Sequence, residues 1–309
     1  MFWAVLGLIG VGLIFTFTGV VMSAAPRRGV ETSTVQLVGA VCSACISLAL
    51  LRCYPPVPWG EAFAVRAVIL YAVTGVLNFL MCQAIAAAMK TGPNSIVWTM
   101  AQSGMVLTFL YGVLFQHDIM NVWRGCGMAL LVAALVCMGV ARGRNAEENS
   151  PRTGRWLVWA ILAFLLCGGN QITNVIPSND PEVQRHFNYA ARNLSLSAAT
   201  IVTALVWNLL ASPKHCWTSL ARELRSPWLW GFVAAMQSFS LVCTYLLQYR
   251  CIDVLARHHT AAIAYPLMIS SCLIGFACYS LLVLRERLTR LQAAGLLASL
   301  AGILLVCVK

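Results

Sequence analysis

Amide side chains lie inside an apolar stretch of the sequence, where they could hold a polar solute by hydrogen bonds. The octapeptide CGGNQITN, residues 167–174, belongs to an apolar run that extends from about Trp156 to about Ile176. Asn170 and Asn174 are four residues apart, so a helix would present them on one face. An amide without a hydrogen-bond partner in an apolar medium costs roughly 2–7 kcal/mol. We therefore expect these amides either to line a central, water-accessible cavity and bind substrate, or to bond neighbouring helices to each other.

Further polar and aromatic side chains lie in other apolar runs. In the segment NSIVWTMAQSGMVLTF, residues 94–109, Trp98 and Gln102 are four residues apart and would share one helix face. The alternative for Trp98 is packing in the core. We predict that the substrate-binding side chains are Asn170, Asn174, Gln102, Trp98, Asn78, Gln237 and Tyr265.

The residue types favour binding over catalysis. We place no acidic or basic residue in the middle of an apolar run, whereas enzymes and proton-coupled carriers need titratable groups where their chemistry occurs. The 13 cysteines lie mostly in apolar runs, without metal-ligand spacing. We therefore expect no enzyme, catalytic residue, metal or cofactor, and a neutral or zwitterionic cargo. The alternative cargo is an organic cation or quaternary ammonium compound, held by Trp98 and Tyr265 through cation–π attraction.

The composition indicates that the chain is dissolved in lipid. Of its 309 residues, 60% are hydrophobic and 10% are charged, whereas soluble proteins carry about 25% charged residues. The net charge of +11 would suggest nucleic acid as the partner of a soluble protein. Here the basic residues cluster in short breaks between apolar runs, as membrane proteins require. We therefore expect a lipid bilayer and a small-molecule substrate as partners, and no nucleic acid.

Ten apolar runs are long enough for membrane-spanning helices, since about 17–25 such residues cross a bilayer. The seventh run is the weakest, because Asn193 and Ser195 lie near its start. Arg192 is counted with the arginines of the breaks. The predicted spans are residues 2–23, 33–52, 66–89, 94–115, 122–141, 155–176, 190–211, 228–249, 260–284 and 289–308.

An internal repeat divides these spans into two sets of five. Residues 94–135 align without a gap with residues 262–303, at an offset of 168. Asp118 aligns with Glu286, and each acid follows a span and precedes a glycine by nine residues. We expect these acids to cap the start of the next helix or to pair with nearby arginines. Because five is odd, the second set would be inverted in the membrane, which is an architecture of transporters.

The sequence therefore predicts an all-α membrane protein with ten transmembrane helices, arranged as two inverted five-helix repeats. The first repeat would comprise residues 1–141 and the second residues 155–309, with a polar loop at 142–154 between them.

The end of each repeat resembles the drug/metabolite transporter superfamily in its ten-span, EamA-like form. In that family an acid follows the fourth span, and a short polar turn and a glycine in the last span come after it. The segment LLVLRERLTRLQAAGLLASLAGILLV, residues 281–306, is similar to this pattern, and residues 112–139 are similar with Asp118 in place of the usual Glu. By span count the resemblance covers essentially the whole chain. It implies a secondary carrier or exporter of small metabolites and assigns no substrate residue.

We therefore expect a facilitative or secondary-active transporter that works by alternating access. Its cargo would be a small polar metabolite that is amino acid-like, nucleoside-like or otherwise neutral or zwitterionic. The rival classes are a membrane-embedded enzyme and a non-transporting receptor. The protein would cross the inner or plasma membrane several times, as a monomer or a homodimer. The family implies cytoplasmic termini, whereas the positive-inside rule favours the opposite orientation; we follow the family.

Overall fold

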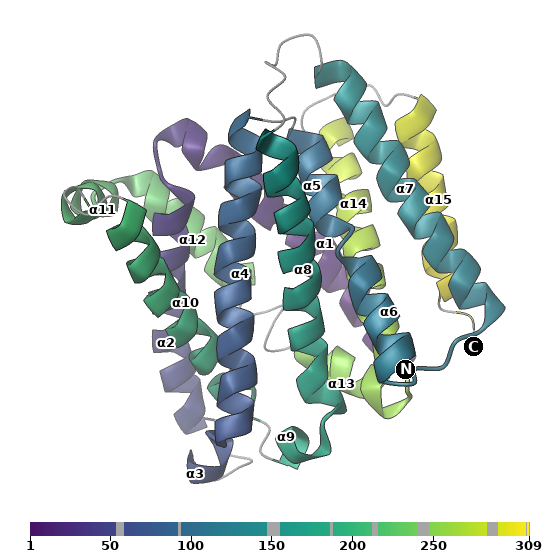
Figure 1. Ribbon diagram of the computed structural model, residues 1–309, viewed down its shortest axis with the longest axis horizontal. Coiled ribbons are helices and arrows are strands. Elements are labelled where there is room, and N and C mark those ends of the chain that lie inside the picture. The colour runs from purple at the N-terminus through teal and green to yellow at the C-terminus, as the bar shows by residue number, and fades with distance from the viewer. Residues whose placement is uncertain are drawn as a thin grey trace. The chain divides into compact units, whose positions relative to one another are not determined.

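The computed structural model describes residues 1–53, 59–91, 94–146, 155–185, 188–211, 216–239, 247–282, 290–306 and 308, and every regular element in these ranges is a helix (Figure 1). The longer helices are α1 (Phe2–Ala24), α2 (Thr32–Cys53), α4 (Val65–Thr91), α7 (Val122–Ala146), α8 (Arg155–Asn179), α10 (Tyr189–Ala211), α14 (Ala264–Leu282) and α15 (Arg290–Val306). The shorter elements are η1 (Pro26–Arg28), α3 (Trp59–Ala62), α5 (Asn94–Gln102), α6 (Met105–Phe115), α9 (Pro181–Arg185), α11 (Cys216–Leu224), α12 (Pro227–Phe239), α13 (Tyr249–Arg257) and η3 (Ala261–Ile263). The predicted all-α class is confirmed for the described residues.

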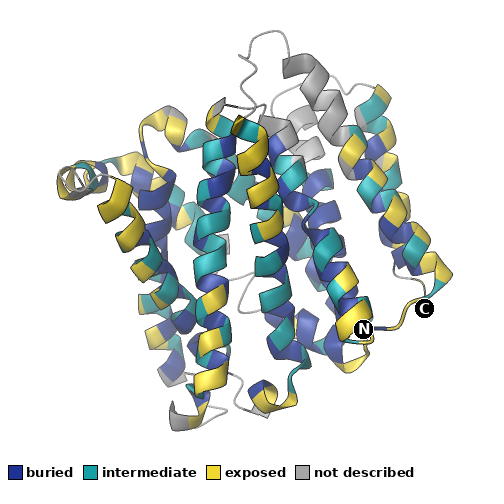
Figure 2. Ribbon diagram, viewed as in Figure 1, coloured by how far each residue is buried: buried dark blue, intermediate teal, exposed yellow. Residues whose placement is uncertain are grey.

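Five of the described helices, α1, α2, α4, α8 and α10, are long and apolar enough to cross a membrane. Large apolar side chains such as Leu114, Leu210 and Leu304 are exposed, and Figure 2 shows exposed and buried residues on the same helices. Exposure of such side chains carries no cost in lipid, which is as apolar as they are. The expectation of a membrane protein is therefore confirmed. The shorter apolar helical segments are Met100–Phe115, Val122–Ala134, Ala261–Gly275 and Ala293–Val306.

The structure interrupts the predicted span 94–115. This segment forms α5 and α6, with a turn at Ser103 and Gly104 between them. Gly104 lies against α8, where an added Cβ would be 2.6 Å from the backbone nitrogen of Gly168. Two glycines thus allow the backbones to approach closely. An interrupted helix is tolerated in membranes where a neighbouring helix covers its backbone.

The described helices belong to two compact units. Unit 1 contains Met1–Thr16, Ala84–Ile172 and Arg250–Lys309, and unit 2 contains Phe17–Gln83 and Thr173–Tyr249. Each unit combines segments from both predicted repeats, because repeats follow sequence order whereas units follow packing. The division into repeats stays a prediction. Glu286 and residues 240–246 of the eighth predicted span lie outside the described residues.

In unit 1, α7 packs along α15, while α14 packs against α6 and α15. Glycine permits the close approach of α7 and α15. A Cβ added at Gly127 would lie 2.7 Å from the backbone nitrogen of Val306 and 2.9 Å from the backbone oxygen of Gly302. Small residues at such a crossing bring the backbones together and increase van der Waals contact between the helices.

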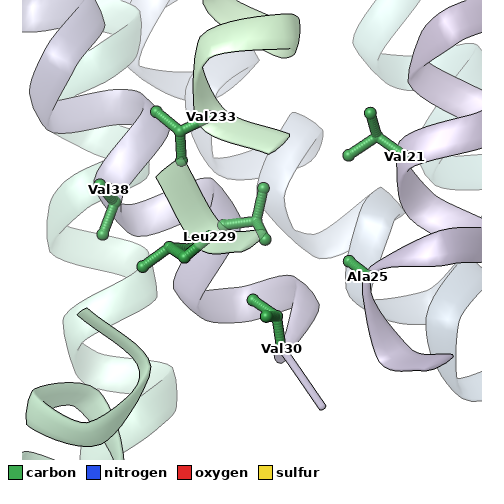
Figure 3. Close-up of a cluster of buried hydrophobic side chains, with 7 residues drawn as sticks. Val21, Ala25, Val30, Val38, Leu229 and Val233 are labelled. Carbon is green, nitrogen blue, oxygen red and sulfur yellow. The ribbon is translucent and has the colours of Figure 1, made fainter. Parts of the chain in front are cut away.

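In unit 2, α2 packs against α10 and α12. A cluster of buried apolar side chains joins the end of α1 and the following turn to α2 and α12 (Figure 3). Leu229 of α12 is fully buried in this cluster. The other buried members are Val21, Ala25, Val30, Val35, Val38 and Val233.

Asp118 caps a helix that is distant in sequence. Its Oδ2 accepts the Ala262 N–H at 2.5 Å, at the start of η3, which leads into α14. The next helix in the chain, α7, is capped by Asn121 instead, whose Oδ1 accepts the Arg124 N–H at 2.8 Å. The expectation that Asp118 caps the following helix is therefore wrong, because its carboxylate lies beside the N-terminus of η3.

We predict opposite effects of alanine at two helical glycines of unit 1. Gly127→Ala places a methyl group against the backbone of α15 and should lower the free energy of unfolding by about 1–3 kcal/mol. Gly10→Ala, where no atom lies within 4 Å of an added Cβ, should raise it by roughly 0.5–1 kcal/mol through reduced backbone entropy. Thermal unfolding of both variants in detergent measures the difference. Equal melting temperatures would contradict the close α7–α15 crossing.

Burial raises the pKa of the Asp118 carboxyl above its usual value, and hydrogen bonds from the Ala262 and Ala261 N–H groups and the charges of His259 and Arg124 oppose this shift. An acid with a higher pKa in the folded state binds more protons when folded. Its contribution to stability is fully present below its unfolded pKa of about 3.9 and is lost as the pH rises through the folded pKa.

We therefore expect the melting temperature of the wild type to fall relative to that of Asp118→Asn as the pH is raised from about 4 to about 8. Asparagine accepts the same N–H bond but does not ionise. Thermal unfolding of both proteins at several pH values in this range measures the effect. Parallel curves would exclude an ionisation of Asp118 that is linked to folding.

Candidate functional site

An arginine is buried in the first turn of α10, inside unit 2. Arg192 has only 1% of its surface exposed. Asn188 determines where the helix begins, since its Oδ1 accepts the N–H groups of Ala190 at 2.9 Å and Ala191 at 3.2 Å, as an N-cap does. The cap makes Tyr189 the first helical residue. Arg192 therefore lies within the helix, as the predicted span 190–211 implies, although its charge is counted with those of the breaks.

Hydrogen bonds and aromatic faces hold the Arg192 guanidinium. Its Nη2 donates to the backbone oxygen of Asn174 at 2.6 Å and to the Asn174 Oδ1 at 3.2 Å. Its Cζ lies 3.5 Å from the ring centroid of Tyr249 and 5.2 Å from that of Tyr71, which are cation–π distances. Tyr189 stacks on Tyr249, with ring centroids 6.2 Å apart. We call Arg192, Asn174, Tyr71, Tyr189 and Tyr249 the Arg192 cluster.

A proline lies in α8 close to the backbone carbonyl that accepts the hydrogen bond from Arg192. Pro177 lies inside α8 and has no N–H to donate to the carbonyl of Thr173, four residues earlier. Arg192 donates to the next carbonyl, that of Asn174. Neighbouring helices commonly satisfy backbone groups near a proline in membrane helices. The contact between α10 and α8 thus lies three residues before Pro177.

Arg192 brings a positive charge into this cluster. The guanidinium is a cation, and the N-terminal end of α10 adds the positive end of the helix dipole. The amide of Asn174 and the tyrosine rings are neutral. The arrangement would attract a carboxylate, which matches the planar donor geometry of arginine, and would repel a cation. Across the described ranges, no group of three or more His, Cys, Asp or Glu side chains could hold a metal ion.

Another amide of the CGGNQITN segment bonds two helices of unit 1. Gln171 is buried, and its Oε1 accepts the Thr108 hydroxyl at 3.1 Å. Its Nε2 donates to the Cys167 sulfur at 3.2 Å. The amide therefore ties α8 to α6, just beyond the turn that interrupts the predicted fourth span. Of the two roles expected for these amides, Gln171 has the second, because it bonds neighbouring helices to each other.

The predicted substrate-binding residues are divided between the units. Those in unit 1 are Trp98, Gln102, Asn170 and Tyr265, and those in unit 2 are Asn78, Asn174 and Gln237. Asn170 and Asn174 thus belong to different units although they share a helix face. Gln102 and Tyr265 are buried, and Asn78, Trp98 and Asn170 are half-buried.

Two of the predicted residues in unit 2 already bond neighbouring helices. Asn174 accepts from Arg192, as described. Gln237 of α12 donates from its Nε2 to the backbone oxygen of Gly39 on α2 at 2.7 Å. These bonds position both amides, and a role in binding substrate stays a prediction for them.

Arg192, Tyr71 and Tyr249 are not among the residues predicted from the sequence to bind substrate. Arg192 lies within the predicted span 190–211, but its charge is counted with the arginines of the breaks. One local signal was present, since an N-cap at Asn188 places the helix start before Arg192. No local signal pairs Arg192 with Tyr71 or Tyr249, because these contacts depend on how the helices pack.

Solved structures share this fold. Twenty-eight chains match, and one of them, described only as "Crystal structure of protein", has a TM-score of 0.68 and 12% sequence identity. The alignment covers 98% of this chain and 96% of the other. At this identity the likeness extends to the fold alone. No protein-family model and no curated protein matches the chain.

We predict that the ring of Tyr249 stabilises the protein through its face. Tyr249→Leu should lower the free energy of unfolding by about 2–4 kcal/mol, because it removes a desolvated cation–π contact and an aromatic stack. Tyr249→Phe keeps both contacts and should cost less than about 1 kcal/mol. Denaturation of the two variants in detergent measures the difference. Equal losses would assign the effect to the hydroxyl group instead.

Proposed function

We propose that this protein is a membrane carrier that moves a small polar metabolite by alternating access, and that the Arg192 cluster forms part of its cargo site. The observation that carries the proposal is a charged side chain, 1% exposed, among apolar helices. Ionisable residues inside membrane proteins are costly and commonly mark substrate pathways. The bond from Arg192 to Asn174 brings this charge to an amide already predicted to bind substrate.

The chemistry of the cluster favours a zwitterionic cargo over a cationic one. A guanidinium at a helix N-terminus would bind the carboxylate of an amino acid-like solute. The tyrosine rings and the Asn174 amide could contact the rest of such a molecule. The organic-cation alternative rests on Trp98 and Tyr265 in unit 1, and Arg192 would oppose it at the cluster.

The proposal includes ten spans in two inverted repeats, in the inner or plasma membrane. A pair of contacts inside unit 1 supports the repeats. Gly104 of the α5–α6 turn lies against Gly168 of α8, and Thr16 of α1 donates from its hydroxyl to the backbone oxygen of Cys272 of α14 at 3.2 Å. Cys272 and Gly104 differ by 168 positions, which is the offset of the sequence repeat, and α1 and α8 contain the first spans of the two proposed repeats. Each contact is thus the counterpart of the other when the repeats are exchanged.

Unit 2 offers a second pair of this kind. The Thr200 hydroxyl of α10 donates to the backbone oxygen of Gly75 on α4 at 3.2 Å. Gln237 of α12 donates to that of Gly39 on α2. In the proposed repeats α2 corresponds to α10 and α4 to α12, so exchanging the repeats turns one contact into the other. Such symmetry suits a carrier that must expose one site to two sides and is not required of an enzyme or a receptor.

The test uses matched pairs of solutes with and without a free carboxylate. Purified full-length protein is screened by thermal shift against amino acids and their methyl esters, and stabilising compounds are then measured for flux into liposomes. A ligand at 100 times its Kd adds about 2.7 kcal/mol of stability. We expect free acids to stabilise the protein and esters not to.

Variants separate the proposed site from nonspecific effects. Arg192→Gln should weaken binding by about 10- to 100-fold, corresponding to about 1.5–3 kcal/mol for a charged hydrogen bond. Arg290→Gln makes the same change at an exposed residue and should leave affinity unchanged. Saturable flux that is insensitive to Arg192→Gln would retain the carrier and remove the cluster from its site. Binding without flux would favour a receptor.

A further inference from the structure

Helix α11 lies at one end of the apolar helices of unit 2. It connects α10, which ends at Ala211, to α12, which begins at Pro227. In Figure 1 α11 is seen nearly end-on, whereas α2 and α10 run up the picture, so α11 crosses the direction of these helices. Since α2 and α10 are long enough to span a membrane, their ends mark the level of the lipid headgroups.

The turn between α1 and α2 meets α11 at this level. Glu223 of α11 is 4% exposed, and its carboxylate accepts the Glu31 N–H at 3.1 Å. The Arg28 guanidinium lies 4.0 Å from the ring centroid of Trp228 at the start of α12. These contacts fix α11 and the turn to each other and direct the acid of α11 inward.

The basic side chains of the same region face outward. Arg28, Arg222 and Arg225 are exposed, as is Glu31. Among the described residues, the exposed side chains thus contribute three positive charges and one negative charge. Glu223, buried in its bond to the Glu31 backbone N–H, adds a second negative charge, so the described residues of this region still carry a net charge of +1.

Three tryptophans are exposed beside these arginines. The exposed fractions are 61% for Trp217, 47% for Trp228 and 49% for Trp230. The Trp230 Nε1 donates to the backbone oxygen of Leu224 at 2.9 Å, which holds this indole at the end of α11. Tryptophan with arginine at the ends of spanning helices is the composition found at the headgroup level of membranes.

We propose that this α11 surface, formed by Arg28, Trp217, Arg222, Arg225, Trp228 and Trp230, binds the headgroups of anionic phospholipids. The arginines would donate to the lipid phosphates, to which their geometry is suited, and the indoles would lie at the boundary with the acyl chains. Charge decides between lipid and a second copy of this chain, because two copies meeting through this surface would bring like charges together.

The test measures the thermal stability of the full-length protein in a neutral detergent during lipid titration. The arms are phosphatidylglycerol, phosphatidylcholine with the same acyl chains, and inorganic phosphate. We expect phosphatidylglycerol to stabilise the protein at a lower concentration than phosphatidylcholine, and inorganic phosphate to have no effect. The triple variant Arg28→Gln/Arg222→Gln/Arg225→Gln should raise the phosphatidylglycerol midpoint by roughly tenfold or more, since each arginine near an anionic surface contributes about a factor of five.

The matched control carries the same three changes at exposed arginines elsewhere, Arg155→Gln/Arg257→Gln/Arg290→Gln, and should keep the wild-type midpoint. A second readout does not depend on unfolding. Brominated phosphatidylglycerol quenches the fluorescence of tryptophans that it contacts. We expect it to quench the wild type more than Trp217→Phe, because the variant lacks the Trp217 indole. Equal midpoints for the two triple variants, equal responses to the two lipids, stabilisation by phosphate alone, or dimers cross-linked through this surface would each overturn the proposal.

Discussion

A hydrogen-bonding group inside an apolar helical protein must find its partner in the protein itself, because lipid offers none. This constraint selects which helices pack together. Asn193 donates from its Nδ2 to the hydroxyls of Ser43 at 2.7 Å and Ser47 at 2.9 Å, joining α10 to α2. Gln171 and Thr108 join α8 to α6, and the Arg192 cluster joins α10 to α8. Apolar contacts alone would tolerate helices sliding past one another, whereas each of these pairs specifies a register.

The sequence was sufficient to predict that buried amides need partners, but not to identify them. The all-helical class and membrane character follow from the length and composition of the apolar runs. The partner of Asn174 is Arg192, which lies 18 residues later on another helix. Such a pairing depends on tertiary packing, which hydrophobic periodicity does not encode. The burial of Arg192 was not predicted, because a basic residue near the start of a span usually reaches the interface.

Long-range contacts also explain why the local sequence pattern predicted the wrong helix as the partner of Asp118. Asp118 behaves as a cap, as its type and position suggested, but the helix that it caps is 144 residues away. A closer residue, Asn121, fulfils the local role. The interruption of the helix at Gly104 could likewise not be predicted, since a single glycine is compatible with a continuous helix. The helix is interrupted where Gly104 lies against the backbone of α8, and this contact is not encoded in the local sequence.

The close contact of Gly104 with Gly168 has a consequence for how such a protein can diverge. An alanine at Gly104 would meet backbone atoms, the nitrogen of Gly168 at 2.6 Å and the oxygen of Phe164 at 3.0 Å. An alanine at Gly275 would instead meet the hydroxyl of Thr16 at 2.6 Å, which a second substitution can remove. Side-chain obstacles permit compensated change, whereas backbone obstacles do not. Among proteins with the same helix crossings, positions 16 and 275 should therefore covary, while position 104 should remain glycine.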